Sequence, residues 1–161
     1  MRGNVDTRLR KLDEGRYGAI VLAAAGLRRL GWSDRITELL TPDVMCPAVG
    51  QGALAIETRG AGEGFDAGRA LEDADTRAAI TAERNVLAAL GGGCQVPIGA
   101  YATVAQGRLR IQAVVVSPNG AEVVRGRSEG AASDAEHIGR ALGGELLERG
   151  ARKILDAVYS V

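Results

Sequence analysis

The sequence predicts an α/β segment followed by a small α+β domain, and three observations support this. An apolar run of strand length at residues 17–25 precedes a short helical pattern, which is the order of an α/β unit. Three strand patterns separated by hairpin signals follow between residues 98 and 127. Helical patterns flank these strands, so the second half contains both a sheet and the helices to cover one face of it.

The first half alternates helix and strand patterns. Thr7–Gly15 contains helix formers and ends at a glycine, and Tyr17–Ala25 is predicted to be a buried strand. Ala25–Gly31 is predicted to be a short helix that ends at its glycine. A connector rich in proline and glycine, Pro42–Gly52, then leads into another strand candidate, Ala53–Thr58.

The second half begins after a glycine-rich stretch. Four glycines between Arg59 and Gly68 predict a flexible loop or linker. A helix is expected over Asp75–Leu90, because its apolar residues recur on one face. The three predicted strands are Ile98–Ala105, Leu109–Val116 and Ala121–Arg127.

Two further helices complete the predicted second half. Residues 133–136, Ser-Asp-Ala-Glu, predict a capping box at the start of a helix whose Ile138, Leu142 and Leu146 recur every four residues. Two adjacent glycines inside that helix, residues 143 and 144, predict close packing against a neighbour, because glycine is unfavourable in a helix interior. A last helix is expected over Ala151–Tyr159.

Composition limits the classes of partner. The chain is 46% hydrophobic and 25% charged, as in globular proteins. Its net charge of zero argues against a nucleic acid or a membrane surface as the partner of the whole chain. The sequence has neither an apolar run long enough to span a bilayer nor a signal-peptide pattern, so we expect a cytoplasmic protein. Its two cysteines, Cys46 and Cys94, are not expected to pair.

Basic residues concentrate at the N-terminal end. Residues 1–35 contain eight basic and four acidic residues, a net charge of +4, and arginine predominates. Guanidinium groups bind carboxylates through two hydrogen bonds, which lysine cannot do, so this segment is a candidate site for an acidic ligand. The alternative is a compositional bias toward arginine, with most of these side chains simply solvated.

Cys94 lies in a glycine-rich stretch between a helix pattern and a strand pattern. Gly91–Gly93 allow positive φ angles before it, and Pro97 begins an extended run after it. A free cysteine is most often a small buried apolar residue. A thiol in a loop between rigid elements is also a suitable place to attach a bulky group covalently.

Four segments in order resemble the hydroxymethylbilane synthases, also called porphobilinogen deaminases. The stretch GGGCQVPIGAY at residues 91–101 is similar to the family's cofactor-attachment loop. RGNVDTRL at residues 2–9 resembles its arginine-bearing strand-to-helix turn, and PAVGQGA at residues 47–53 resembles a segment with the same letters. LAAAGLRRL at residues 22–30 lies between them, so the resemblance extends through essentially the whole chain.

The resemblance implies a domain organisation. Residues 1–46 are expected to be the C-terminal part of the family's second domain, an incomplete doubly wound α/β domain of the periplasmic-binding-protein type. Residues 47–72 are expected to be a return segment and linker. Residues 73–161 are expected to form the C-terminal α+β domain, with a three-stranded antiparallel sheet, covering helices and the cofactor cysteine.

The resemblance also implies an activity and a site. The family joins four porphobilinogen molecules head to tail, with release of ammonia, to form hydroxymethylbilane in tetrapyrrole biosynthesis. In this family a dipyrromethane cofactor is held through a thioether, here on Cys94, and no metal is implied. The candidates for binding the acetate and propionate groups of porphobilinogen and the growing oligopyrrole are Arg2, Arg8, Arg29, the backbone around Ala23 and Gly26, and Gln51. The one histidine, His137, is expected on a solvated helix face.

The family's catalytic aspartate belongs to an N-terminal domain that has no counterpart in these residues, so no residue here is assigned a catalytic role. We expect the chain to be an inactive C-terminal fragment whose partner is the missing half. We also expect the first half to self-associate, because its strands lack their neighbours. Two alternatives remain open, a non-catalytic anion-binding module and a purely structural one.

Overall fold

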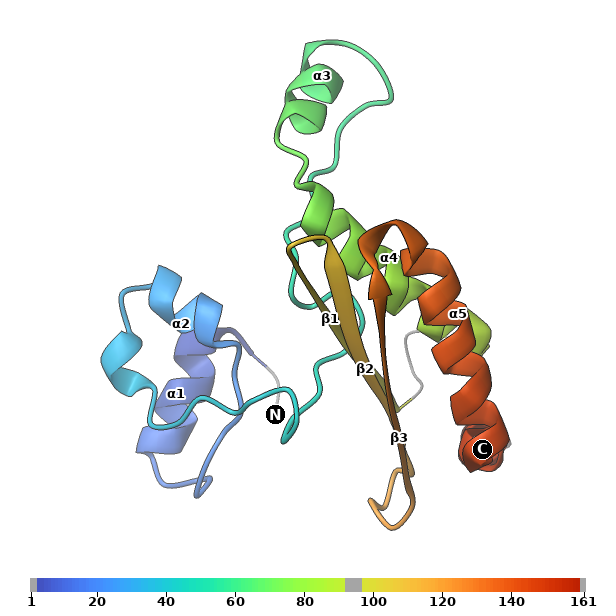
Figure 1. The fold of residues 1–161 in the computed structure, drawn as a ribbon. Helices are drawn as coiled ribbons and strands as arrows, with labels where there is room; N and C mark the ends of the chain where they lie inside the picture. Colours follow the sequence, from blue (N-terminus) through green and yellow to red (C-terminus); the bar gives the residue numbers. More distant parts are fainter. Residues whose placement is uncertain (1–2, 92–96, 160–161) are drawn as a thin grey trace. The chain divides into compact units, whose positions relative to one another are not determined.

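A computed structural model describes residues 3–91 and 97–159 of the chain. The chain divides into two compact units, Met1–Thr41 and Pro42–Val161. Figure 1 shows the order of the elements along the chain.

The first unit is helical. It contains α1 (Val5–Asp13), α2 (Ala24–Arg29) and a 3-10 turn, η1 (Ser33–Arg35). The buried apolar side chains of this unit, among its described residues, are Leu9 and Leu27. An ion pair of 2.6 Å between Arg35 and Asp13 links η1 to the end of α1.

The predicted strand Tyr17–Ala25 is wrong for the described structure. Residues 16–23 form no ladder, and α2 begins at Ala24. A strand needs a neighbour for its backbone hydrogen bonds, and the described residues of this unit include no other strand. Val21 is accordingly 62% exposed. The doubly wound fold expected for residues 1–46 therefore stays a prediction.

The second unit contains the predicted three-stranded antiparallel sheet, in the order β1-β2-β3. The strands are β1 (Ile98–Ala105), β2 (Arg108–Val116) and β3 (Val123–Ala131). The sheet and both hairpins are confirmed. Gln106 and Gly107 both have positive φ, +51° and +71°, as a tight two-residue hairpin turn requires.

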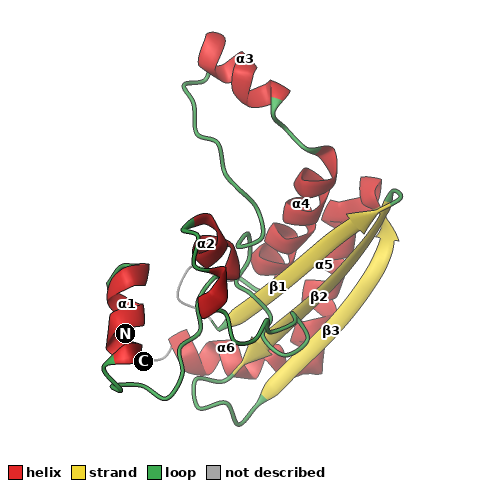
Figure 2. Ribbon diagram, turned by 90° about the vertical axis from the view of Figure 1, so that its left-hand side faces the viewer, coloured by secondary structure: helices red, strands yellow, loops and turns green. Residues whose placement is uncertain are grey.

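Helices cover one face of this sheet (Figure 2). These are α4 (Ala74–Ala89), α5 (Ala135–Leu146) and, after a π turn at Leu147–Ala151, α6 (Arg152–Tyr159). α4 packs on β1 and α5 packs on β3, and the two helices pack against each other. The predicted every-fourth-residue stripe on α5 is confirmed, because Ile138, Leu142 and Leu146 are all buried.

One of the two central glycines of α5 makes the close contact that was predicted. A Cβ at Gly143 would lie 2.5 Å from the Ala89 Cβ of α4. Gly144 has no such neighbour within 4 Å, so the prediction was wrong for this residue. The close packing of α5 on α4 therefore depends on Gly143 and not on Gly144.

Two local predictions are corrected. The glycine-rich stretch Arg59–Gly68 contains the start of a helix, α3 (Glu63–Ala70), which follows Gly62 at φ +95°. Acidic Glu63 in its first turn interacts favourably with the helix dipole. The capping box at Ser133 does not form, because the Ser133 hydroxyl donates to the Asp134 carboxylate and a 3-10 turn, η2 (Ala132–Asp134), leads into α5.

Candidate functional site

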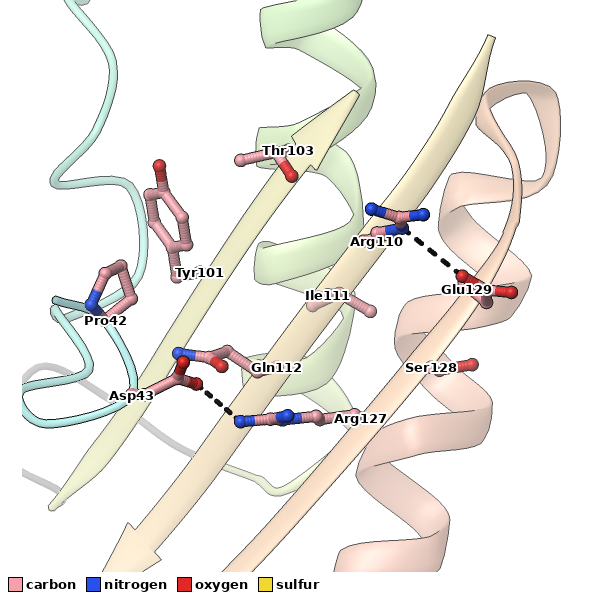
Figure 3. A pocket seen from close by; sticks show the side chains of 10 residues that line it. All are labelled: Pro42, Asp43, Tyr101, Thr103, Arg110, Ile111, Gln112, Arg127, Ser128 and Glu129. Atoms are coloured by element: carbon pink, nitrogen blue, oxygen red, sulfur yellow. Dashed lines mark hydrogen bonds and ion pairs between the residues drawn. The ribbon is translucent and has the colours of Figure 1, made fainter. Parts of the chain in front are cut away.

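The sheet face opposite the helices contains a shallow groove of about 530 Å³ (Figure 3). Side chains that alternate along the strands line it, and its polar members include Tyr101, Thr103, Gln112 and the two arginines Arg110 and Arg127. Both arginines are already paired with acids, Arg110 with Glu129 at 3.4 Å and Arg127 with Asp43. The groove therefore has no guanidinium group without an acidic partner.

A stretch of the connector, residues 42–50, lies along this sheet face, and we call it the strap. At one end Asp43 accepts hydrogen bonds from Arg125 and Arg127 of β3. In its middle the Pro47 carbonyl accepts from the Ala100 N–H of β1 at 3.0 Å. A Cβ at Gly99 would lie 3.0 Å from the Pro47 carbonyl oxygen, so the strap fits against β1 because residue 99 has no side chain.

The other end of the strap is held by Glu83, in the middle of α4. This carboxylate is 3% exposed. Its Oε2 accepts from the Gly50 N–H at 2.8 Å, and its Oε1 accepts from the Ala102 N–H of β1 at 2.9 Å. Burial raises the pKa of the Glu83 carboxyl, and the two N–H donors lower it, with burial the larger effect.

Gln51, one of the predicted ligand contacts, directly follows this anchored glycine. Gly50 has a φ of +78°, and the Gln51 N–H donates to the Ala48 carbonyl at 3.2 Å, which closes a tight turn. The Gln51 side chain itself is exposed. The turn therefore presents a neutral hydrogen-bonding group to solvent from an anchored backbone.

Two of the predicted site residues, Cys94 and Arg2, lie outside the described residues. The elements on either side of the cysteine are described. Leu90, at the end of α4, is 4% exposed, and Ile98, at the start of β1, is 8% exposed. The chain thus enters and leaves the cysteine stretch from positions fixed in the core of the second unit.

The remaining predicted site residues belong to the first unit. Arg8 on α1 donates through Nε to the Gly3 carbonyl at 2.8 Å, and Arg29 ends α2. Neither guanidinium pairs with a carboxylate among the described residues, whereas Arg10 and Arg35 of the same unit do.

Ala23 and Gly26 lie at the start of α2, where the predicted backbone site is only partly available. Ala23 is the residue before the helix, and its carbonyl accepts the Gly26 N–H at 3.0 Å. The Gly26 N–H is therefore already used within the turn. Only the N–H groups before it are open to a ligand.

Sequence reasoning missed Glu83 and Arg28. Glu83 interrupts the apolar stripe of α4 between the buried residues Ala79 and Val86, and a charged residue on a buried stripe was the available signal. Arg28 lies next to Arg29 and also lacks a carboxylate partner among the described residues.

One histidine, one membrane criterion and one metal criterion complete the description of the residues outside the strap. His137 is exposed on α5, as predicted. Among residues 3–91 and 97–159, no helix is long and apolar enough to cross a membrane. In the same residues, no cluster of three or more histidine, cysteine or acidic side chains is arranged to hold a metal ion.

Two family models match the chain in succession. One, described as "Porphobilinogen deaminase, dipyromethane cofactor binding domain", matches residues 1–66. The other, described as "Porphobilinogen deaminase, C-terminal domain", matches residues 77–148. Cys94 falls within the second match, between α4 and β1.

Curated relatives named porphobilinogen deaminase align over nearly all of the chain. That of Syntrophobacter fumaroxidans is 49% identical over 160 residues, which cover 99% of this chain and 52% of the relative. That of Gloeobacter violaceus is 52% identical over 161 residues, covering 99% and 49%, and that of Thiobacillus denitrificans is 51% identical over 159 residues, covering 98% and 52%. The chain spans about half the length of these relatives. Two domain models match in the order of the family, and these relatives are 49% to 52% identical over nearly the whole chain. The chain therefore belongs to the porphobilinogen deaminase family and shares its dipyrromethane-binding domain.

Proposed function

We propose that the chain is the C-terminal part of a hydroxymethylbilane synthase and contributes to condensing four porphobilinogen molecules into linear hydroxymethylbilane, with release of ammonia, in tetrapyrrole biosynthesis. The observation that carries this proposal is the pairing state of the arginines. The predicted ligands Arg8 and Arg29 lack an acidic partner among the described residues, while their neighbour Arg10 pairs with Glu14. Guanidinium groups without an acidic partner suit a ligand that carries several carboxylates.

Cys94 is proposed to hold the dipyrromethane through a thioether. When bound, this group would supply the primer to which porphobilinogen is added. The donor set fits such a group in its chemistry, because each pyrrole carries an acetate and a propionate and the first unit offers Arg8 and Arg29 as cations. Arg2, the backbone N–H groups near Ala23, and Gln51 are the proposed additional contacts.

The proposed roles of these residues are binding and orientation. The catalytic aspartate of the family is proposed to come from an N-terminal half that these residues do not include. Without it the chain alone is expected to be inactive and to keep a free Cys94 thiol. We propose a cytoplasmic location, and the domain boundaries after residues 46 and 72 stay as predicted.

Intact-mass spectrometry combined with a complementation assay tests this function. The chain is expressed alone or together with the N-terminal half of the Gloeobacter violaceus relative, and porphobilinogen consumption is followed. We expect a dipyrromethane adduct and turnover only in the combined sample. Cys94→Ala should abolish both, while Cys46→Ala should abolish neither. Turnover by the chain alone, or rescued turnover that survives Cys94→Ala, would contradict the proposal.

A pair of substitutions on α1 separates this enzyme from the alternatives. In the combined sample, Arg8→Ala should raise the KM for porphobilinogen by about tenfold or more, because a charge-assisted hydrogen bond is lost. Arg10→Ala removes the same type of charge two residues further along α1, where the side chain forms an exposed ion pair with Glu14. It should leave KM nearly unchanged. Equal effects of the two substitutions would point to general electrostatics instead of a site.

A further inference from the structure

Glu83 is unusual in the second unit, because it is the one charged or polar residue found buried among the described residues. An ionised carboxylate is costly to remove from water unless hydrogen bonds replace its solvation. Here each oxygen has its own backbone donor, Gly50 from the strap and Ala102 from β1. One side chain thus joins three segments of the chain, α4, the strap and the edge strand.

Both donors would otherwise lack partners. The N–H group of Ala102 points outward from the edge of the sheet, where no further strand follows β1 among the described strands. Gly50 is held at a φ of +78°, a conformation that directs its N–H toward α4 and that other residues rarely adopt. An apolar residue at position 83 would leave two poorly solvated N–H groups unpaired, which proteins generally avoid.

The two ends of the strap differ in burial. The ion pair between Asp43 and Arg127 is exposed, with side-chain accessibilities of 64% and 72%, so solvent and salt screen it. The Glu83 end is screened far less because it is buried. Of the two ends, the one that leads into the turn is therefore held by the less screened contact, Glu83.

We propose that Glu83 is a positioning residue, whose carboxylate fixes the turn that carries Gln51 against edge strand β1 of the C-terminal unit. Glu83 touches no ligand itself. It acts through the Gly50 N–H, one residue before Gln51. The idea that Gln51 contacts substrate rests on the function proposed above, whereas the anchoring by Glu83 does not.

Amide hydrogen exchange measured by NMR on the ¹⁵N-labelled chain tests the anchoring without any substrate. In the unmodified chain the Gly50 and Ala102 amides should exchange slowly. Glu83→Gln keeps the shape but offers one acceptor oxygen where the carboxylate has two. At least one of the two amides should then exchange faster by about tenfold or more, since a hydrogen bond to a charged group is lost.

The readout that a merely structural role would not produce is local loss of order at the turn. In Glu83→Gln the ¹H–¹⁵N heteronuclear NOE of Gln51 should fall, and exchange at Gly50 should accelerate more than exchange at the core residues Val115 and Leu142. Glu136→Gln is the matched control. It makes the same chemical change at an exposed ion pair on α5, and it should leave the Gly50 and Gln51 signals as they are.

The proposal is overturned if Gly50 and Ala102 exchange as fast as unprotected amides in the unmodified chain. This measurement uses the unmodified chain, so it tests the proposal even if the variant does not fold. It is also overturned if Glu83→Gln accelerates all core amides equally and leaves Gln51 ordered. Failure of the complementation assay in the previous section would instead remove only the substrate role of Gln51.

Discussion

Gly139 of α5 lies directly against the carbonyl oxygen of Ala82 of α4, and a Cβ at position 139 would be 2.3 Å from that oxygen. The obstacle is backbone, which cannot rotate away as a side chain can. Gly139→Ala should therefore push the two helices apart and lower the free energy of unfolding by about 1–3 kcal/mol. Urea denaturation followed by circular dichroism measures this.

Gly144→Ala, in the same helix, is the control for that substitution. Apart from its own turn of helix, nothing lies within 4 Å of the new Cβ, so alanine should fit and stabilise the helix by up to about 1 kcal/mol. Opposite signs for the two substitutions are expected. Destabilisation by both would mean that helix propensity and space do not decide the outcome here.

The stability contributed by Glu83 should decrease as pH rises. Burial raises the pKa of this carboxyl above the ordinary glutamate value of 4.5, so the folded chain holds the proton more tightly than the unfolded chain. Between 4.5 and the folded-state pKa, the unmodified chain should lose stability relative to Glu83→Gln, which does not titrate. Urea unfolding of both proteins at a series of pH values from 4.5 upward measures the difference. If the free energy of unfolding of the unmodified chain rose with pH relative to that of Glu83→Gln, the predicted sign would be wrong.

Asp73 caps the N-terminus of α4, where its Oδ1 accepts the Thr76 N–H at 2.7 Å. Hydrogen bonding by the Thr76 side chain and, second, by its backbone N–H lowers the pKa of Asp73 from 3.8. The stability contributed by this cap is therefore present above that value and is lost as pH falls through the folded-state pKa. At neutral pH, Asp73→Ala should lower the melting temperature and Asp73→Asn should largely preserve it. Asp75→Ala, in the first turn without the cap contact, should have a smaller effect. Equal losses at positions 73 and 75 would show that charge, and not the cap, matters.

Cys46 should react slowly with alkylating reagents. Partial burial raises the pKa of its thiol, although the positive charge of Arg125 lowers it, so less of the reactive thiolate is present at neutral pH. In a Cys94→Ala background, iodoacetamide labelling of folded protein, followed by mass spectrometry, should be slower than labelling in urea. Arg125→Ala should slow the folded-state reaction further. Labelling at the same rate in both states would mean that the thiol is not shielded.

The segment after the strap should promote self-association of the chain. Leu54 is 87% exposed and Ile56 is 56% exposed, in an extended stretch that pairs with no described strand. Exposed apolar strands seek partners, so light scattering should show concentration-dependent oligomers that Leu54→Lys combined with Ile56→Lys disperses. Val123→Lys adds a charge elsewhere and should not disperse them. A monomer at all concentrations would contradict the expectation.

The second unit was predictable from sequence because its signals are local and agree with one another. The turns at Gln106-Gly107 and Ser117–Gly120 fix two hairpins, and the four-residue spacing of Ile138, Leu142 and Leu146 fixes the buried face of α5. β3 was displaced by a few residues, to Val123–Ala131, because pairing with β2 and not its own apolar run sets its ends. Local patterns rarely define element boundaries as well as they define element type.

The first unit was less predictable because a strand is not a local structure. The run Tyr17–Ala25 has the composition of a buried strand, but the described residues of its unit include no neighbouring strand with which its backbone could form hydrogen bonds. The role of Glu83 was hidden for a related reason. Its donors, Gly50 and Ala102, are 33 and 19 residues away along the chain, and no spacing rule connects them.

The outward amides of β1 at Ala100 and Ala102 are satisfied by the Pro47 carbonyl and by Glu83, so the strap and α4 together protect this edge of the sheet. Inherited or engineered variants within residues 47–50 consequently cannot be classified from activity alone. A change there alters both the turn that presents Gln51 and the protection of a sheet edge, and a misfolded protein would look like a catalytic defect. Measuring steady-state abundance beside turnover distinguishes these two kinds of lesion.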